Sequence, residues 1–100
     1  MKILAIEHDT PAATPEAFTE KLKQAEALKV WELCQSDALR EIYFRADQHA
    51  AVLMLECPTL DAARDLLNSL PLVRAGLIEF ELIPLRAYPG FSRLFAPGLG

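Results

Sequence analysis

The stretch from Leu66 to Pro89, LLNSLPLVRAGLIEFELIPLRAYP, constrains the fold more than any other part of the chain. Its first leucines continue the apolar stripe of a helix, and Pro71 prevents that helix from continuing. From Ile78 apolar and polar residues alternate, which predicts a strand with two different faces. Pro84 is compatible with such a strand only at an edge or an end of a sheet. The stretch therefore predicts a helix, a turn and a final edge strand, in that order.

The segments before this stretch complete a recognisable order. Apolar and β-branched runs predict strands at 2–8, 39–45 and 50–57, while apolar stripes behind threonine caps predict helices at 14–34 and 59–70. The order is strand, helix, strand, strand, helix, strand. We therefore predict the α+β class and a ferredoxin-like arrangement, with a four-stranded antiparallel sheet and two helices on one of its faces.

The first predicted helix has a well-defined start and a well-defined end. Thr14 is expected to cap it, with Pro15 at the first helical position. Asp37, just after the helix, is expected to take a left-handed backbone conformation. The predicted apolar side of this helix consists of Phe18, Leu22, Ala25, Leu28, Trp31 and Leu33.

The second face of the predicted sheet is also apolar, since it carries Tyr43, Val52, Met54 and Ile83. Two helices cover only one face, so another surface must bury this one. A second copy packed sheet against sheet is the simplest solution. We therefore expect a homodimer with a barrel-like interior.

The end of the chain differs from the body in composition. We divide the chain into a domain at 1–87 and an apolar tail at 88–100. The tail contains four large apolar residues: Tyr88, Phe91, Leu94 and Phe95. We expect it to dock on the domain or on a neighbouring subunit.

Composition excludes several classes of protein. The chain has 100 residues, enough for one domain, and a net charge of −4 with scattered basic residues, which argues against nucleic acid and anionic membranes as partners. No apolar run is long enough to span a membrane, and the first residues lack a signal-peptide pattern, so we expect a cytoplasmic protein. Cys34 and Cys57 form no CxxC pair; they are expected to be small buried hydrophobes, with a nucleophilic role as the alternative.

Leu70-Pro71-Leu72, the alternating strand after it, and Pro89 beyond a short gap resemble the dimeric α+β barrel superfamily, and within it the muconolactone isomerase family. The resemblance implies a homodimer or a larger ring. We take the fold and the assembly from this resemblance, but no catalytic residue. The family has a lysine in its first strand, where this chain has Ile6, Glu7 and His8, and it has a histidine at the position of Tyr88.

Two residues at strand ends are candidates for proton transfer. Glu56 ends an apolar strand, where desolvation would raise its pKa; the alternatives are an ion pair with Arg45 and simple exposure. His8 ends the first strand and could relay a proton, or be an ordinary surface histidine. His49, in a hairpin loop, is expected to be solvated.

Three residues are candidates for substrate binding. Arg45 is a possible anchor for a ligand carboxylate, or a salt-bridge partner of Glu56 or Asp47. Tyr43 and Trp31 could form an aromatic wall, or belong to the core.

Other motifs are weaker. Glu79 and Glu81 could act as a carboxylate pair, but an exposed edge or a dimer salt bridge is the simpler interpretation. No metal-ligand spacing or phosphate loop occurs, so we expect neither a metal nor a cofactor.

Three functions remain open. The first is a lactone-isomerase-like enzyme that transfers a proton on a small anionic or lactone metabolite. The second is a non-catalytic ligand-binding or interaction module, and the third is a monooxygenase-like member of the superfamily.

Overall fold

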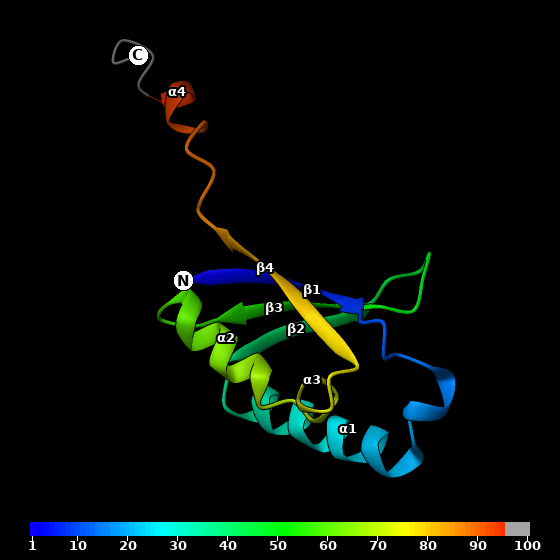
Figure 1. Cartoon of the computed structure of the whole chain (residues 1–100). Coiled ribbons are helices and arrows are strands. Elements are labelled where there is room, and N and C mark those ends of the chain that lie inside the picture. The colour runs from blue at the N-terminus through cyan, green and yellow to red at the C-terminus, as the bar shows by residue number, and fades with distance from the viewer. Residues whose placement is uncertain (96–100) are drawn as a thin grey trace.

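The computed structural model of the chain describes residues 1–95. Figure 1 shows helices on one side of a twisted sheet and a C-terminal segment that leaves the body. In chain order the elements are β1 (Lys2–Asp9), the 3₁₀ turn η1 (Pro15–Ala17), α1 (Glu20–Gln35), β2 (Leu39–Phe44), β3 (Ala51–Glu56), α2 (Leu60–Asn68), α3 (Pro71–Arg74), β4 (Ile78–Leu85) and α4 (Ser92–Phe95).

The sheet has four strands in the order β2-β3-β1-β4, and every neighbouring pair is antiparallel. Ile3 lies opposite Leu55 on one side and opposite Pro84 on the other. The two central strands are thus the first and third in the chain, as the split βαβ arrangement requires. The predicted α+β, ferredoxin-like fold is confirmed.

One face of the sheet forms the core with the helices. Alternate residues of β1 and β3 point to this face, and Ile3, Ala5, Leu53 and Leu55 are all at most 1% exposed. Leu67 of α2 packs in the same cluster, together with residues of α1. Burial of this apolar surface is the main term that stabilises the domain.

The Leu66–Pro89 stretch folds largely as predicted. The helix ends slightly earlier than expected, at Asn68, and Pro71 then opens the short helix α3 rather than a plain connector. Gly76 turns the chain with a positive φ of 76°, a conformation that glycine adopts without strain. Asp37, after α1, has a φ of 66°, which confirms the left-handed conformation expected there.

Pro84 lies in β4, and β4 is an edge strand, as predicted. The backbone N–H of Thr10 donates to the carbonyl of Leu77, and hydrogen-bonded pairs alternate along an antiparallel ladder. Counting every second residue of β4 from Leu77, the backbone groups of Glu79, Glu81 and Ile83 form the hydrogen bonds with β1. Pro84 therefore occupies a position whose missing N–H would have faced solvent, so the ladder loses no bond.

The start of the first helix differs from the prediction. Pro15 begins only one 3₁₀ turn, and Thr14 makes no capping hydrogen bond. Phe18, with a ψ of 73°, interrupts the helical backbone. The longer helix starts afresh at Glu20, where the Thr19 hydroxyl accepts a hydrogen bond from Leu22 N–H at 3.2 Å. Thr19 rather than Thr14 is therefore the effective cap.

The packed side of α1 is also rotated from the predicted stripe. Leu28 and Trp31 are 60% and 63% exposed, so they lie on the outer side of the helix. Leu33 is buried, and Glu26 and Val30 are half-buried toward the sheet. The helix thus turns a carboxylate inward, because the lysines and glutamates around it leave no continuous apolar stripe to choose the orientation.

The second face of the sheet has no covering layer within residues 1–95, as Figure 1 shows. Its apolar side chains are half-exposed on the central strands and exposed at Tyr43 on β2. They comprise Leu4 and Ile6 of β1, Val52 and Met54 of β3, and Ile83 of β4. This open face matches the second apolar face predicted from the sequence.

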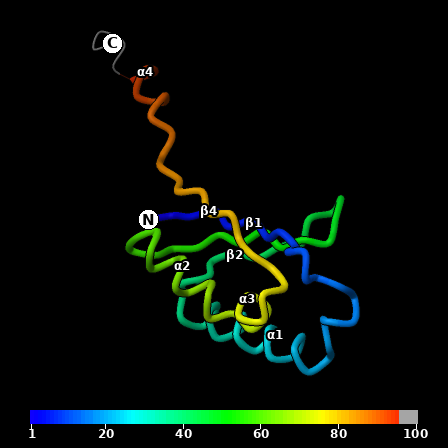
Figure 2. Tube along the Cα trace, in the orientation of Figure 1, coloured from blue at the N-terminus to red at the C-terminus, as the bar shows by residue number. Residues whose placement is uncertain are grey.

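The C-terminal segment leads away from the body, as the trace in Figure 2 shows. It makes the described chain 61 Å long against 29 and 21 Å in the other directions. Tyr88 and Phe91 contact each other edge to face at 5.0 Å, yet both are more than 60% exposed, as are Leu94 and Phe95. Residues 96–100 of the predicted tail lie outside the described residues.

Candidate functional site

A cavity of about 570 Å³ lies between the helix-facing side of the sheet and α1 and α3. Its walls are mainly apolar and include the rings of Phe18, Phe44 and Phe80. Ionisable side chains from the sheet, the hairpin loop and α1 also line it: Glu7, Asp9, Lys23, Glu26 and His49. A largely apolar cavity with a few polar groups is the usual form of a small-molecule site.

Glu7 is the one buried charged residue among those described, at 9% exposed. It follows Ile3 and Ala5 on the helix-facing side of β1, so the strand period of two directs it inward. Its Oε1 accepts a hydrogen bond of 3.4 Å from the backbone N–H of Ala51. Burial raises the pKa of Glu7, and the nearby charges of Asp9 and Glu26 raise it further, against the lowering effect of the Ala51 bond and of His49.

Glu26 reaches the same cavity from α1. Its Oε1 accepts a hydrogen bond of 3.0 Å from the backbone N–H of Leu72, in the first turn of α3. Burial raises the pKa of Glu26, and the bond from Leu72 opposes that increase. Two carboxyl groups with raised pKa values thus line one largely apolar cavity, an arrangement that suits proton transfer.

The far side of the cavity is formed by the hairpin between β2 and β3. The His49 ring stacks on Phe44 with centroids 4.7 Å apart and an interplanar angle of 25°. His49 is exposed, as expected from the sequence, but it is also a lining residue, which the sequence did not indicate. Lys23, on α1, has its Nζ 3.0 Å from Glu20 Oε1.

The predicted carboxylate anchor lies elsewhere. Arg45 forms a bidentate ion pair with Asp47 in the hairpin, at 2.9 Å through Nε and 2.7 Å through Nη2. The salt bridge with Asp47 was one of the sequence alternatives, and it is confirmed. Asp47 raises the pKa of Arg45 and accepts hydrogen bonds from its Nε and Nη2 atoms. Arg45 is not a lining residue of the cavity.

Glu56 closes β3 at the opposite end of the molecule from the hairpin. Its Oε2 accepts a hydrogen bond of 2.7 Å from the Met1 amino group. That bond lowers the pKa of Glu56, whereas the sequence predicted an increase by desolvation. The prediction was wrong because the side chain of Glu56 lies on the open face of the sheet. There it pairs with the positively charged Met1 amino group and is not surrounded by apolar side chains.

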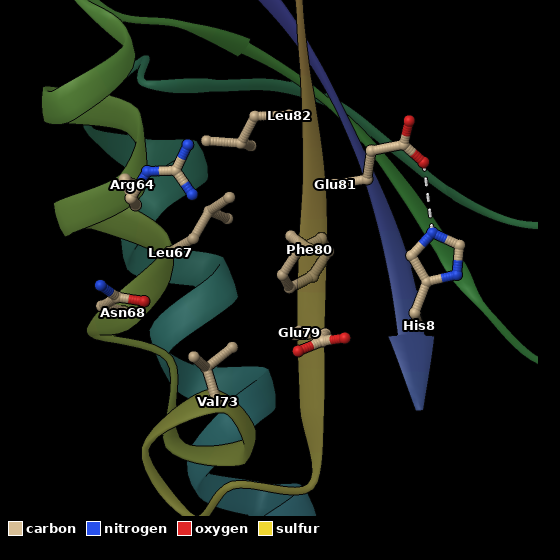
Figure 3. Close-up of a pocket in the computed structure, with 9 residues that line it drawn as sticks. All are labelled: His8, Arg64, Leu67, Asn68, Val73, Glu79, Phe80, Glu81 and Leu82. Atoms are coloured by element: carbon tan, nitrogen blue, oxygen red, sulfur yellow. Dashed lines mark hydrogen bonds and ion pairs between the residues drawn. The ribbon is translucent and has the colours of Figure 1, made fainter. Parts of the chain in front are cut away.

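His8 lies on the open face, where its Nε2 is 3.3 Å from Glu81 Oε1. It is also a lining residue of a second, smaller pocket of about 290 Å³, whose other lining residues come from β4, α2 and α3. Figure 3 shows His8 and Glu81 on one side of β4, while Arg64 and Leu67 project from α2 on the other side. His8 is thus separated from Glu7, its neighbour in sequence, by the thickness of the sheet.

Tyr43 and Trp31 lie on different surfaces, and neither is a lining residue of the large cavity. Tyr43 is 63% exposed on the open face and donates a hydrogen bond of 3.0 Å to Glu41 Oε1. Trp31 is equally exposed, on the outer side of α1. Neither the core position nor the cavity position expected for these residues is found. Cys57 is buried and Cys34 half-buried, and burial raises the pKa of the Cys57 thiol.

The five predicted site residues, His8, Trp31, Tyr43, Arg45 and Glu56, do not converge on one pocket. Their proposed roles stay predictions. Glu7 and Glu26 were not predicted as a pair. Glu7 could have been found from its shared face with Ile3 and Ala5, whereas Glu26 gives no signal because it follows the charged pattern of an exposed helix side.

The sheet order and the single helix layer define the class of fold, which is an α+β, ferredoxin-like fold. The chain is similar to the crystal structure of muconolactone isomerase, with a TM-score of 0.73 and 23% identity over 90% of this chain and 93% of that one. The predicted resemblance is therefore confirmed at the level of the fold.

A second similar structure is 5-chloro-2-hydroxyhydroquinone dehydrochlorinase from Burkholderia phenoliruptrix AC1100, in complex with 2,5-dihydroxybenzoquinone. Its TM-score is 0.65, with 14% identity over 88% of this chain and 96% of that one. No family model and no curated protein sequence matches the chain.

Two further observations apply to residues 1–95. No helix there is both long and apolar enough to cross a membrane. No group of three or more His, Cys, Asp or Glu side chains in that part of the chain is placed to hold a metal ion.

Proposed function

We propose that the protein is a small-molecule enzyme that moves a proton between two positions of an unsaturated lactone or a related carbonyl compound. The observation that carries the proposal is the pair of carboxyl groups, Glu7 and Glu26, both with raised pKa values and both lining one apolar cavity. The similarity in fold to an isomerase and a dehydrochlorinase supports the class of reaction.

The two carboxyl groups are suited to different roles. Glu26 has the shorter backbone hydrogen bond, 3.0 Å from Leu72, which stabilises its charged form and suits it to act as the base. Glu7 is more deeply buried and faces the charges of Asp9 and Glu26, which favours its protonated form and suits it to act as the acid.

In the proposed reaction Glu26 removes a proton from the carbon next to a carbonyl group, and the electrons of that C–H bond pass into the carbonyl. Glu7 then gives its proton to the γ carbon of the resulting dienolate, and the double bond moves by one position. One proton is taken and one is given, so the substrate and product are isomers. The protons redistribute between the carboxyl groups and water before the next turnover.

Solvent deuterium tests this proposal. The protein is incubated in D₂O with a β,γ-unsaturated butenolide, and proton NMR follows the position of the double bond and the uptake of deuterium at the γ carbon. Catalysed uptake that is lost in Glu7→Gln and kept in Glu32→Gln, an exposed carboxylate on the same helix, is the expected result. Uptake at the uncatalysed rate with the unchanged protein, over a panel of such lactones, would refute the enzyme proposal.

We also propose that the chain self-associates through the open face of the sheet and the C-terminal segment 86–95. The half-exposed apolar side chains of the open face and the exposed rings of Tyr88 and Phe91 support this, since monomers rarely leave such surfaces uncovered. Gly90 lets the Tyr88 ring fold over the backbone, where a Cβ would collide with it.

Light scattering on a size-exclusion column tests the assembly. The full chain should elute as a dimer or a larger ring, and a chain that ends at Arg86 should dissociate more readily on dilution. A monomer at all concentrations for both chains would contradict the proposal. That outcome would also weaken the second candidate function, a non-catalytic interaction module, which rests on the same exposed surfaces.

A further inference from the structure

The charges around the large cavity are unbalanced. Three lining residues are acidic, Glu7, Asp9 and Glu26, and Lys23 is the one lysine or arginine among the described lining residues. Its Nζ lies 3.0 Å from Glu20 Oε1, so that charge is already shared with a further carboxylate. The cavity therefore carries a net negative charge whenever its carboxyl groups are ionised.

The cation that the sequence suggested for a substrate carboxylate is absent from this cavity. Arg45 is held in its bidentate pair with Asp47, outside the lining residues. A ligand carboxylate placed between the apolar walls would lose its hydration and be repelled by Glu26, the carboxyl group proposed to be charged. The geometry therefore penalises the anionic substrates expected from the sequence.

The free carboxyl oxygens of the cavity favour ligands that donate hydrogen bonds. Glu7 and Glu26 each use Oε1 for one backbone N–H, and the Oε2 atom of each accepts no hydrogen bond from a described residue. Phenylalanine rings from three separate elements, Phe18, Phe44 and Phe80, supply flat apolar walls. A volume of about 570 Å³ accommodates a single-ring metabolite with room for substituents.

We infer that the cavity selects uncharged planar rings that bear hydroxyl or carbonyl groups, and discriminates against the same rings when they carry a carboxylate. The inference rests on the proposed function, because it specifies the substrate class of the same site. It assigns Glu26 a second role, as a specificity residue that repels anionic substituents.

A matched pair of ligands tests the inference. The probes are a butenolide with a carboxymethyl substituent, as its free carboxylate, and the methyl ester of the same compound. Calorimetry at about pH 8, where ordinary carboxyl groups are ionised, should give a dissociation constant for the ester at least about tenfold lower than for the carboxylate. Equal or tighter binding of the carboxylate would overturn the inference and leave the proposed function standing.

The two proposals fail in distinguishable ways. Glu26→Gln removes one negative charge and should bring the ester-to-carboxylate ratio toward one, while Glu32→Gln, outside the cavity, should keep the ratio of the unchanged protein. A preference for the ester that is the same in both variants would overturn the role of Glu26. If neither ligand binds and no deuterium is exchanged, both the inference and the proposed function are wrong.

Discussion

The two faces of the sheet use the same strands for different chemistry. Glu7 points to the helix side of β1, where burial raises its pKa. Glu56, on the open side of β3, has its pKa lowered by the Met1 amino group. Both are glutamates on central strands, so the difference arises from the helix layer, which within residues 1–95 covers one face of the sheet and not the other. A covering layer removes water and favours the neutral acid, whereas an open face lets a cation pair with the charged form.

The largest expected contrast between the two faces concerns stability. Leu53, which is 1% exposed, points to the core, and its neighbour Met54 points to the open face. Leu53→Ala should lower the free energy of unfolding by about 2–5 kcal/mol, because the smaller side chain leaves a cavity that the packed helices cannot fill completely. Met54→Ala should have an effect of about 1 kcal/mol in the dissociated chain. Urea unfolding at low protein concentration measures both, and equal losses would mean that the open face is also part of a core.

The second contrast concerns catalysis. Glu26→Gln should reduce kcat by about a hundredfold or more in the deuterium-exchange assay, since it removes the proposed base. Glu56→Gln and His8→Gln change titratable groups on the other face and should leave kcat within about twofold. A large loss in either open-face variant, with Glu26→Gln still active, would return the site to the residues predicted from the sequence.

The third contrast is the sign of the pH dependence of stability. The pKa of Glu7 is raised above 4.5 in the folded chain, so its favourable contribution is present below that pH and is lost as pH rises through the folded pKa. Glu7→Gln should therefore gain stability relative to the unchanged protein between about pH 4 and about pH 7.

Glu56 should behave in the opposite way. Its pKa is lowered below 4.5, so its contribution is present above that pH and is lost as pH falls through the folded pKa. Glu56→Gln should therefore lose stability relative to the unchanged protein as pH rises from about 3 to about 5. Denaturant unfolding at the two ends of each variant's interval gives the two slopes, and slopes of the same sign would contradict the assignment of the two environments.

The smallest expected effect is that of Arg45→Ala on KM, which tests whether Arg45 anchors a ligand carboxylate, as the sequence suggested. If Arg45 anchored a ligand carboxylate, Arg45→Ala would raise KM strongly for anionic substrates. Because Arg45 is paired with Asp47 outside the cavity, we expect a change in KM of less than about twofold. Steady-state kinetics on the carboxymethyl butenolide and its ester distinguish the two, and a large increase in KM for the carboxylate alone would restore Arg45 as an anchor.

Most of the fold was predictable because local patterns and the required burial agree. The alternation after Ile78, the end of α2 ahead of Pro71 and the left-handed Asp37 each depend on local sequence, and each is found close to its predicted place. The helix start was not predictable to the residue, because Thr14 and Thr19 are both good caps. The structure places the effective cap at Thr19, after the break in the helical backbone at Phe18.

The sequence by itself determined the order of strands and helices, the edge position of β4 and the apolar second face of the sheet. These follow from spacings of two to four residues along the chain and from the geometry of proline. The tertiary structure alone decided which ionisable groups line the same cavity. Glu7 and Glu26 are nineteen residues apart, and nothing in the local pattern brings them together. Their meeting depends on the rotation of α1 over the sheet and on the backbone N–H groups of Ala51 and Leu72.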